Sequence, residues 1–183
     1  MPKRPPKPTH FDLCEEYLQT VRDLLAHPKV QSMGRFMQHR NVDCLHHSLN
    51  VSFTGYRICR RLGLDCRAAA RGGLLHDFFL YDWHKGNPHK GLHGFTHPRV
   101  AEDNAARYFS VTKRERDIIR KHMWPLTLAP PRYPESYVIL LVDKFYCIAE
   151  AFAPSGFKGV RRLIRHARKN GLLSAPLLPV NLD

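Results

Sequence analysis

The sequence has no long run of apolar side chains. The longest, Tyr137 to Val142, ends at Asp143 and is far shorter than the roughly 20 residues that a membrane-spanning helix needs. Residues 1–8 are basic, but no apolar stretch follows them, so we expect no signal peptide there. We therefore expect a cytoplasmic protein that has no membrane partner.

Cysteine pairs and the usual signatures of nucleophilic catalysis are also missing. The five cysteines are scattered and form no C-x-x-C pair, which argues against a thiolate zinc site. The chain contains no nucleophile elbow, no P-loop and no H-E-x-x-H motif. The twelve histidines are the side chains that carry most of the chemical information.

Acidic residues are few compared with basic ones. The chain has 29 Lys and Arg against 16 Asp and Glu, a formal net charge of +13 at pH 7. Such an excess implies attraction to nucleic acid or to phosphorylated small molecules. The basic segment 157–169 either binds such a polyanion or docks an apolar stripe and leaves its cations in solvent.

The fold class follows from the spacing of apolar residues, because no segment alternates between apolar and polar residues as a strand does. We predict an all-α, single-domain helical bundle over residues 9–153. Residues 1–8 form a disordered tail, and residues 154–183 form a basic helix and a C-terminal tail packed on the same domain. The helices are expected over 9–27, 28–37, 42–62, 66–80, 97–109, 113–123, 135–152 and 157–169.

Polar side chains that can bind a metal recur near the ends of these helices. Successive helices joined by short loops run antiparallel, so residues at a start, an end, a start and an end meet at one end of a bundle. An acidic residue in the middle of a neighbouring helix can reach the same point. The residues in these positions are His47, His76 with Asp77, His97, His122 and, in the middle of its helix, Asp143.

Asp143 is surrounded by apolar residues in the sequence. A buried, unpaired carboxylate costs on the order of 3–5 kcal/mol, so Asp143 needs a cation or a metal unless it lies on an exposed stripe beside Lys144. Imidazoles and carboxylates together suit Fe, Mn or Zn. Four histidines and two aspartates are enough for two metals that share one carboxylate.

Three motifs, taken in order, resemble a known family. His47-Ser-Leu-Asn-Val, Leu74-Leu-His-Asp77 and Leu141-Val-Asp-Lys144 are similar to the H…HD…D signature of the HD-domain metal-dependent phosphohydrolases, over residues 42–150. His97 and His122 extend the likeness to the H-HD-H-H-D subset, which includes diadenosine-tetraphosphate hydrolases and cyclic-dinucleotide phosphodiesterases. The glycine of the HDIG variant and a Gly-Tyr-Pro triplet are missing, which bears on the substrate more than on the chemistry.

The resemblance implies an HD-type fold and a dinuclear metal centre that hydrolyses a nucleotide or another phosphoester with a metal-activated hydroxide. Fe and Mn are the expected metals, and Zn, Co, Ni and Mg are alternatives. Asp77 is implied as a catalytic residue together with Lys144, which contacts the phosphate or else extends into solvent. The implied ligands are His47, His76, Asp77 and Asp143 for one metal, and Asp77, His97 and His122 for the other.

The loop over residues 81–96 joins two of the ligand helices and must pass over the site. Trp83 can stack on a base, while His84, Lys85 and Arg99 can meet phosphates; the alternative is a solvated loop with incidental charges. His93 competes with His97 as a ligand, and His46 competes with His47. We prefer the second residue of each pair, because His97 leads into a helix and His47 matches the family motif.

Two other functions remain open. A mononuclear nucleotidase would need only His47, His76, Asp77 and Asp143. A basic RNA- or ribosome-binding protein with a vestigial metal site would explain the net charge instead.

Overall fold

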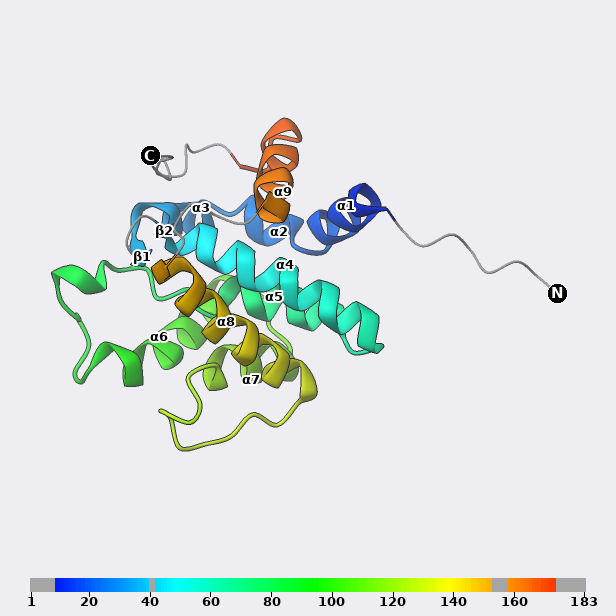
Figure 1. Ribbon diagram of the computed structural model, residues 1–183. Coiled ribbons are helices and arrows are strands. Elements are labelled where there is room, and N and C mark those ends of the chain that lie inside the picture. Colours follow the sequence, from blue (N-terminus) through cyan, green and yellow to red (C-terminus); the bar gives the residue numbers. More distant parts are fainter. Residues whose placement is uncertain (1–8, 40–41, 153–157, 174–183) are drawn as a thin grey trace.

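Helices make up nearly all of the regular structure in the computed structural model, which describes residues 9–39, 42–152 and 158–173 (Figure 1). The prediction of an all-α, single-domain bundle is confirmed. Residues 1–8 and 174–183, for which we expected tails, lie outside the described residues. The α-helices are α1 (His10–Thr20), α2 (Arg22–Leu25), α3 (Pro28–Gln31), α4 (Cys44–Leu62), α5 (Cys66–Leu75), α6 (His93–Tyr108), α7 (Lys113–Lys121), α8 (Pro134–Phe152) and α9 (Lys158–Lys169), with 3-10 turns η1 (Ser32–Arg35) and η2 (Trp83–Lys85).

A short antiparallel sheet, β1 (Met37–His39) with β2 (Val42–Asp43), is the element that the sequence analysis missed. The predicted helix over 28–37 is wrong beyond η1, because the backbone at Phe36 is already extended, with φ −107° and ψ 126°. Strands of three and two residues are too short to show an alternating pattern in a sequence.

Three helix boundaries also differ from the prediction. The helix over 9–27 is interrupted at Val21, where φ is −111° and the regular α-helix stops. α5 ends at Leu75, and Leu80, the predicted last residue, has a φ of 62° that no right-handed helix contains. α6 begins at His93, one turn before His97. Because α5 ends at Leu75, His76 and Asp77 lie just beyond this helix rather than inside it.

Capping residues fix the ends of the helices that carry the predicted site. The Asp43 side chain accepts a hydrogen bond from the backbone N–H of His46 and so caps the start of α4. His47 follows within the first turn of this helix. Thr112 and Glu115 form a capping box at the start of α7. Gly63 ends α4 in the left-handed conformation that glycine adopts readily, with φ 68°.

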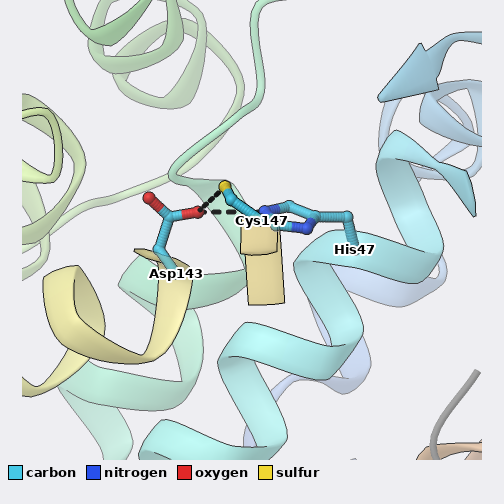
Figure 2. Close-up of side chains that lie close together, drawn as sticks. All are labelled: His47, Asp143 and Cys147. Carbon is cyan, nitrogen blue, oxygen red and sulfur yellow. Dashed lines mark hydrogen bonds and ion pairs between the residues drawn. The ribbon is translucent and has the colours of Figure 1, made fainter. Parts of the chain in front are cut away.

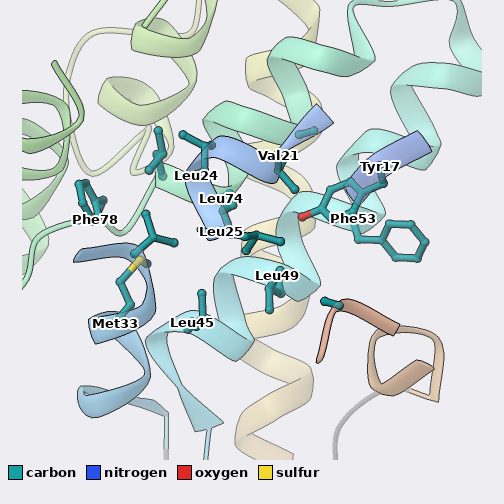
Figure 3. Packing of buried hydrophobic residues seen from close by; sticks show 14 of the residues in the cluster. Tyr17, Val21, Leu24, Leu25, Met33, Leu45, Leu49, Phe53, Leu74 and Phe78 are labelled. Carbon is teal, nitrogen blue, oxygen red and sulfur yellow. The ribbon is translucent and has the colours of Figure 1, made fainter. Parts of the chain in front are cut away.

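Apolar side chains pack on both sides of the central helices α4 and α5. The larger cluster joins these helices to α1, α2, α3, η1, α6, α7 and α9, and Figure 3 shows part of it. The smaller cluster lies where α4 and α5 meet α7 and α8. α9 contributes Val160, Leu163, Ile164 and Ala167 to the larger cluster. Among the described residues, none of the helices is both long and apolar enough to cross a bilayer.

α5 approaches α4 and α8 closely at Gly73. A Cβ atom at Gly73 would lie 3.0 Å from the Cα of Ser52 in α4 and 3.0 Å from Cδ1 of Ile139 in α8. The backbone of α4 cannot yield as the end of a flexible side chain can. The carbonyl that orients His76 belongs to the same Gly73. This contact therefore couples the packing of the bundle to the position of a predicted site residue.

We predict that Gly73→Ala destabilises the protein by about 1–3 kcal/mol, because the added methyl group overpacks the contact between α4 and α5. Denaturant unfolding of purified protein measures the free energy change.

Gly94→Ala is the matched control. Gly94 lies in the first turn of α6, and its added Cβ would meet only the ends of two side chains, Leu126 at 3.2 Å, which is 43% exposed, and Met123 at 3.9 Å. Both alanines gain the same helix propensity. Equal stability of the two variants would contradict the close packing of α4 and α5.

Candidate metal centre

The structure brings all six predicted site residues together in the interior. His47, in the first turn of α4, and Asp143, in the middle of α8, approach from one side. His76 and His122 are the C-cap residues of α5 and α7, and His97 lies in the second turn of α6. None of the six is more than 5% exposed: His47 0%, His76 0%, Asp77 2%, His97 5%, His122 1% and Asp143 3%.

One half of the cluster surrounds Oδ2 of Asp77 and Oδ1 of Asp143. Nε2 of His47 lies 3.1 Å from Oδ1 of Asp143 and 3.9 Å from Oδ2 of Asp77. Nε2 of His76 lies 3.3 Å from Oδ2 of Asp77 and 3.6 Å from Oδ1 of Asp143. The ligand atoms of His47, His76 and Asp77 lie close enough together to hold one metal ion, and Oδ1 of Asp143 faces both of these rings.

The other half of the cluster surrounds the second oxygen of the same carboxylate. Nε2 of His97 lies 3.3 Å and Nε2 of His122 lies 3.5 Å from Oδ1 of Asp77. These three residues also form a group whose ligand atoms could hold a metal ion. Asp77 thus stands between two pairs of imidazoles, with one oxygen directed at each pair.

Hydrogen bonds at Nδ1 aim three of the four histidine rings. Nδ1 of His76 faces the Gly73 carbonyl at 2.7 Å, and Nδ1 of His122 faces the Ile119 carbonyl at 2.8 Å. Nδ1 of His97 faces the carbonyl of His93 at 2.9 Å. A carbonyl can only accept, so each Nδ1 carries the proton. In its neutral form, each ring then directs the Nε2 lone pair into the cluster, as in histidines that bind metals.

The fourth ring is held by a carboxylate. Nδ1 of His47 lies 2.8 Å from Oε2 of Glu150, and Oε1 of Glu150 accepts a 2.8 Å hydrogen bond from the side chain of Asn50. Both partners are buried. A carboxylate behind an imidazole fixes the ring and increases the basicity of its other nitrogen.

The arrangement leaves polar atoms that a cation would satisfy. Nε2 of His97 and Nε2 of His122 lie 2.8 Å apart, so two lone pairs would face each other when both rings are neutral. Metal–nitrogen bonds of about 2.0–2.1 Å meeting near a right angle place two ligands at a similar spacing. Among the described residues, Nε2 of His76 and Oδ1 of Asp77 are buried atoms that make no hydrogen bond. The residues present therefore fit a metal.

Charges in the cluster shift the titration of the ligands. Burial alone would lower the pKa of His47, but Asp143 and Glu150 raise it to about 9. Burial likewise opposes protonation of His76, yet Asp77 and Asp143 raise its pKa to about 10. Burial and the charge of His76 lower the pKa of His122 to about 3. Without metal, two histidines are therefore protonated at neutral pH.

The two central carboxylates remain ionised. Burial raises the pKa of a carboxyl group, but His76 and His97 hold the pKa of Asp77 well below its ordinary value. His47 and His76 do the same for the pKa of Asp143. The cluster therefore offers negative charge to a metal over the whole neutral range.

Cys147 is a nearby thiol that the sequence analysis did not single out. Figure 2 shows Cys147 and His47 directed at the same Oδ1 atom of Asp143, and the sulfur lies 3.4 Å from this oxygen. The three side chains form a further group that could hold a metal ion. Cys147 follows Asp143 by one helical turn in α8, which is the spacing that could have indicated it.

Glu150 and Gln38 are the other residues at the site that the sequence analysis missed. Glu150 lies two turns after Asp143 on the same face of α8, and this spacing in the sequence could have indicated it. The Gln38 side chain donates a 2.6 Å hydrogen bond to Oδ2 of Asp77 from strand β1. No sequence signal indicated Gln38, which lies between the predicted helices over 28–37 and 42–62.

Lys144 lies beside the cluster. Its ammonium donates to Oδ2 of Asp143 at 2.9 Å and to the sulfur of Met123 at 3.3 Å, and its side chain is 40% exposed. Burial opposes the charged form, but the neighbouring Asp143 carboxylate raises the pKa of Lys144. The cation is therefore held next to a predicted ligand and still reaches solvent.

The loop residues that were expected to meet substrate are placed differently from one another. The Trp83 ring stacks on His93 at 5.2 Å, and the His93 ring stacks on His97 at 4.5 Å. His84 and Lys85 are exposed and lie near Asp82, at 3.5 and 3.4 Å. Arg99 is exposed on α6, 4.0 Å from Asp103. Trp83 is thus connected to the cluster through His93, and the His84 ring lies 3.9 Å from that of Trp83.

The two competing histidines lie outside the cluster. The His46 ring lies 2.6 Å from the carboxylate of its own helix cap, Asp43. Nδ1 of His93 lies 2.9 Å from the Tyr81 hydroxyl. His93 supports the site indirectly, because its carbonyl and its ring both contact His97.

Comparison with known proteins gives no relative: no family model matches the chain, and searches of the curated proteins and of the solved structures find no match.

We predict that the metal-free protein loses stability as the pH rises from 6.5 toward 9. The folded-state pKa values of His47 and His76 are raised above the ordinary 6.5, so protonation stabilises the folded state below pH 6.5 and this contribution is lost as pH rises through the raised values. Thermal unfolding in chelator across this range measures the effect. The exposed-residue variant His84→Gln should keep the slope, and a flat profile for the wild-type chain would contradict the raised pKa values.

We predict that His47→Ala lowers affinity for Mn²⁺ by about 10–100-fold or more. The substitution removes a donor atom and leaves Glu150 without its imidazole partner. His46→Ala, a change at the neighbouring position, should leave the affinity unchanged. Isothermal titration with Mn²⁺ measures both. Loss of affinity in His46→Ala alone would reverse the assignment of the two histidines.

Proposed function

We propose that this chain is a metal-dependent phosphohydrolase of the HD type with a dinuclear centre. The observation that carries the proposal is the position of Asp77, whose two oxygens face two separate pairs of imidazoles. A carboxylate in this position suits a bridging ligand. One metal would be held by His47, His76, Asp77 and Asp143, and the other by Asp77, His97 and His122.

The geometry favours two metals over the mononuclear nucleotidase. A single ion held by the first four ligands would leave Nε2 of His97 and Nε2 of His122 buried, facing each other at 2.8 Å. Buried lone pairs without a donor or cation are costly. Iron and manganese suit this mixture of imidazole and carboxylate, with Zn, Co, Ni and Mg as alternatives.

Metal ions in such a site supply positive charge opposite the phosphoryl oxygens and activate water for attack. The chain's own residues hold the geometry for this chemistry. Hydrogen bonds to the Gly73, His93 and Ile119 carbonyls and to Glu150 prevent the four rings from turning. Gln38 donates to Asp77 and keeps its carboxylate in one orientation.

Lys144 is the residue that we assign to substrate binding with the best structural support. Asp143 and Met123 fix its ammonium beside the cluster while part of the side chain faces solvent. An ammonium in this position can donate a hydrogen bond to a phosphate oxygen. The substrate we propose is a phosphorylated small molecule, a nucleotide, which the net charge of +13 would attract.

A second function, binding of RNA through the basic surface, is favoured by one observation. A groove of about 420 Å³ between α1 and α9 is lined by Arg162, Arg165, His166 and Lys169, with Phe11 on the other side. Cations beside an exposed aromatic ring are typical of single-stranded nucleic acid sites. This groove lies on α1 and α9, neither of which carries a residue of the metal cluster.

We predict that the wild-type chain binds two equivalents of Fe or Mn, that His122→Ala binds one, and that Asp77→Ala loses both metals and all turnover. Elemental analysis of protein purified without chelator gives the stoichiometry. A screen of nucleotides and phosphodiesters gives the activity, for which we expect a loss of at least about 10³-fold in His122→Ala.

The control for this series is Arg99→Ala, an exposed change on the ligand helix α6. It should keep both metals, so any effect would be confined to KM. Two metals and full activity in Asp77→Ala would refute the dinuclear enzyme. Salt-dependent RNA binding without hydrolysis of any phosphoester would favour the second function.

A further inference from the structure

The two oxygens of Asp143 have different partners. Lys144 donates a hydrogen bond to Oδ2 at 2.9 Å. Oδ1 instead faces Nε2 of His47 at 3.1 Å and the sulfur of Cys147 at 3.4 Å (Figure 2). Oδ2 is therefore paired with an ammonium, whereas Oδ1 lies beside an imidazole nitrogen and a thiol. A carboxylate oxygen, an imidazole nitrogen and a cysteine sulfur are the three kinds of ligand that bind zinc in proteins.

These ligand atoms have nearly the spacing of a tetrahedral metal site. Metal–sulfur bonds of about 2.3 Å and metal–oxygen bonds of about 2.0–2.2 Å that meet at the tetrahedral angle place sulfur and oxygen about 3.5–3.7 Å apart. The observed separation of Sγ of Cys147 and Oδ1 of Asp143 is 3.4 Å. The corresponding spacing of nitrogen and oxygen is about 3.4 Å, and Nε2 of His47 lies 3.1 Å from the same oxygen. Small shifts would close these three side chains around one ion.

Two helices hold the three ligands in place. Asp143 and Cys147 are one turn apart in α8, so their side chains lie on the same face of one helix. His47 comes from the first turn of α4, and Glu150 fixes its ring through Nδ1. His47 and Asp143 are buried, whereas Cys147 is half-buried. The sulfur is therefore the ligand nearest to solvent.

A second imidazole faces the same carboxylate oxygen. Nε2 of His76 lies 3.6 Å from Oδ1 of Asp143, and among the described residues it is a buried atom that makes no hydrogen bond. A buried polar atom in this state is costly, and a cation close to Oδ1 would compensate for it. The surroundings of Oδ1 thus point to a cation independently of Cys147.

The charge and the softness of the donors decide which cation fits. Asp143 and the thiolate of Cys147 supply two negative charges, and His47 binds a metal as a neutral ring, so a divalent cation is fully balanced. A thiolate favours Zn²⁺ or Cd²⁺, whereas Mn²⁺ prefers oxygen ligands. The missing C-x-x-C pair argues against zinc sites built from paired thiolates. A site with one thiolate needs no such pair.

We propose that His47, Asp143 and Cys147 form an alternative metal site that takes a thiophilic divalent cation such as Zn²⁺ or Cd²⁺. The cation replaces the thiol proton, which leaves to solvent, and Nε2 of His47 binds in its unprotonated form. The site shares His47 and Asp143 with the first metal of the proposed dinuclear centre but has a sulfur in place of Asp77. A thiophilic ion bound here would therefore exclude that first metal. The site does not depend on the proposed enzymatic activity.

Titration of the reduced, full chain with Cd²⁺ tests the site, because a cadmium–thiolate bond absorbs in the ultraviolet and bonds to oxygen and nitrogen do not. The wild-type chain should gain this absorption with one equivalent of Cd²⁺, and Zn²⁺ should remove it by competition. Cys147→Ser, a nearly isosteric change, should abolish the absorption and weaken Cd²⁺ binding in isothermal titration by about 10–100-fold. Its affinity for Mn²⁺ should be unchanged. A wild-type chain without the absorption would overturn the proposal.

Cys66→Ser is the matched control, because Cys66 is also half-buried but lies at the start of α5. It should keep the absorption, and thermal unfolding followed by circular dichroism verifies that both variants fold. Loss of the absorption in Cys66→Ser would overturn the assignment. Absorption that survives in Cys147→Ser would also overturn it, since another thiol would then bind the metal, such as Cys14 beside His10.

A titration of the cadmium-loaded chain with Mn²⁺ separates this site from the proposed dinuclear centre. The loaded chain should bind one equivalent of Mn²⁺ fewer than the free chain, because His47 and Asp143 are already occupied. Equal Mn²⁺ binding by both forms, with two equivalents each, would overturn the shared ligands. A chain that binds no Mn²⁺ but still shows the cadmium–thiolate absorption would refute the dinuclear centre and support the thiolate site.

Discussion

The structure depends on the burial of one carboxylate, Asp77, at the point where helices α4, α5, α6 and α7 meet. A buried negative charge needs compensation on every side, and here four imidazole rings and the Gln38 amide supply it. Each helix end brings one of these rings. The packing of the bundle and the chemistry of the centre are therefore two aspects of the same arrangement.

Helix ends serve both purposes because they leave carbonyl groups without partners. His76 and His122 are the caps of α5 and α7, and each uses a carbonyl of its own last turn to fix Nδ1. The same hydrogen bond satisfies the helix end and directs Nε2 inward. His97 is oriented by the carbonyl of His93, which lies one turn earlier at the start of α6. The orientation of three ligands therefore follows from the backbone rather than from a separate set of supporting side chains.

Helical periodicity and the alternation of helix starts and ends were enough to predict the all-α fold and the meeting of His47, His76, His97 and His122. These features depend on local sequence and on the antiparallel order of neighbouring helices. Gln38 could not be predicted, because a strand of three residues forms only when its partner strand is in place. The start of α6 at His93 was missed for a related reason, since Trp83 and Tyr81, which contact His93, come from the preceding loop.

The stack of Trp83 on His93 and of His93 on His97 places an indole two rings away from the centre. The other tryptophan of the chain, Trp124, follows His122 by two residues. Trp83 also packs against the edge of the larger apolar cluster, whereas the Trp124 ring lies 6.3 Å from that of Tyr137. Intrinsic fluorescence of this chain is accordingly a label-free reporter of the candidate metal site, and a paramagnetic ion such as Mn²⁺ bound there should quench the emission of Trp83. Unfolding curves recorded by tryptophan emission will follow the loosening of this corner of the molecule, whereas circular dichroism will follow the helices.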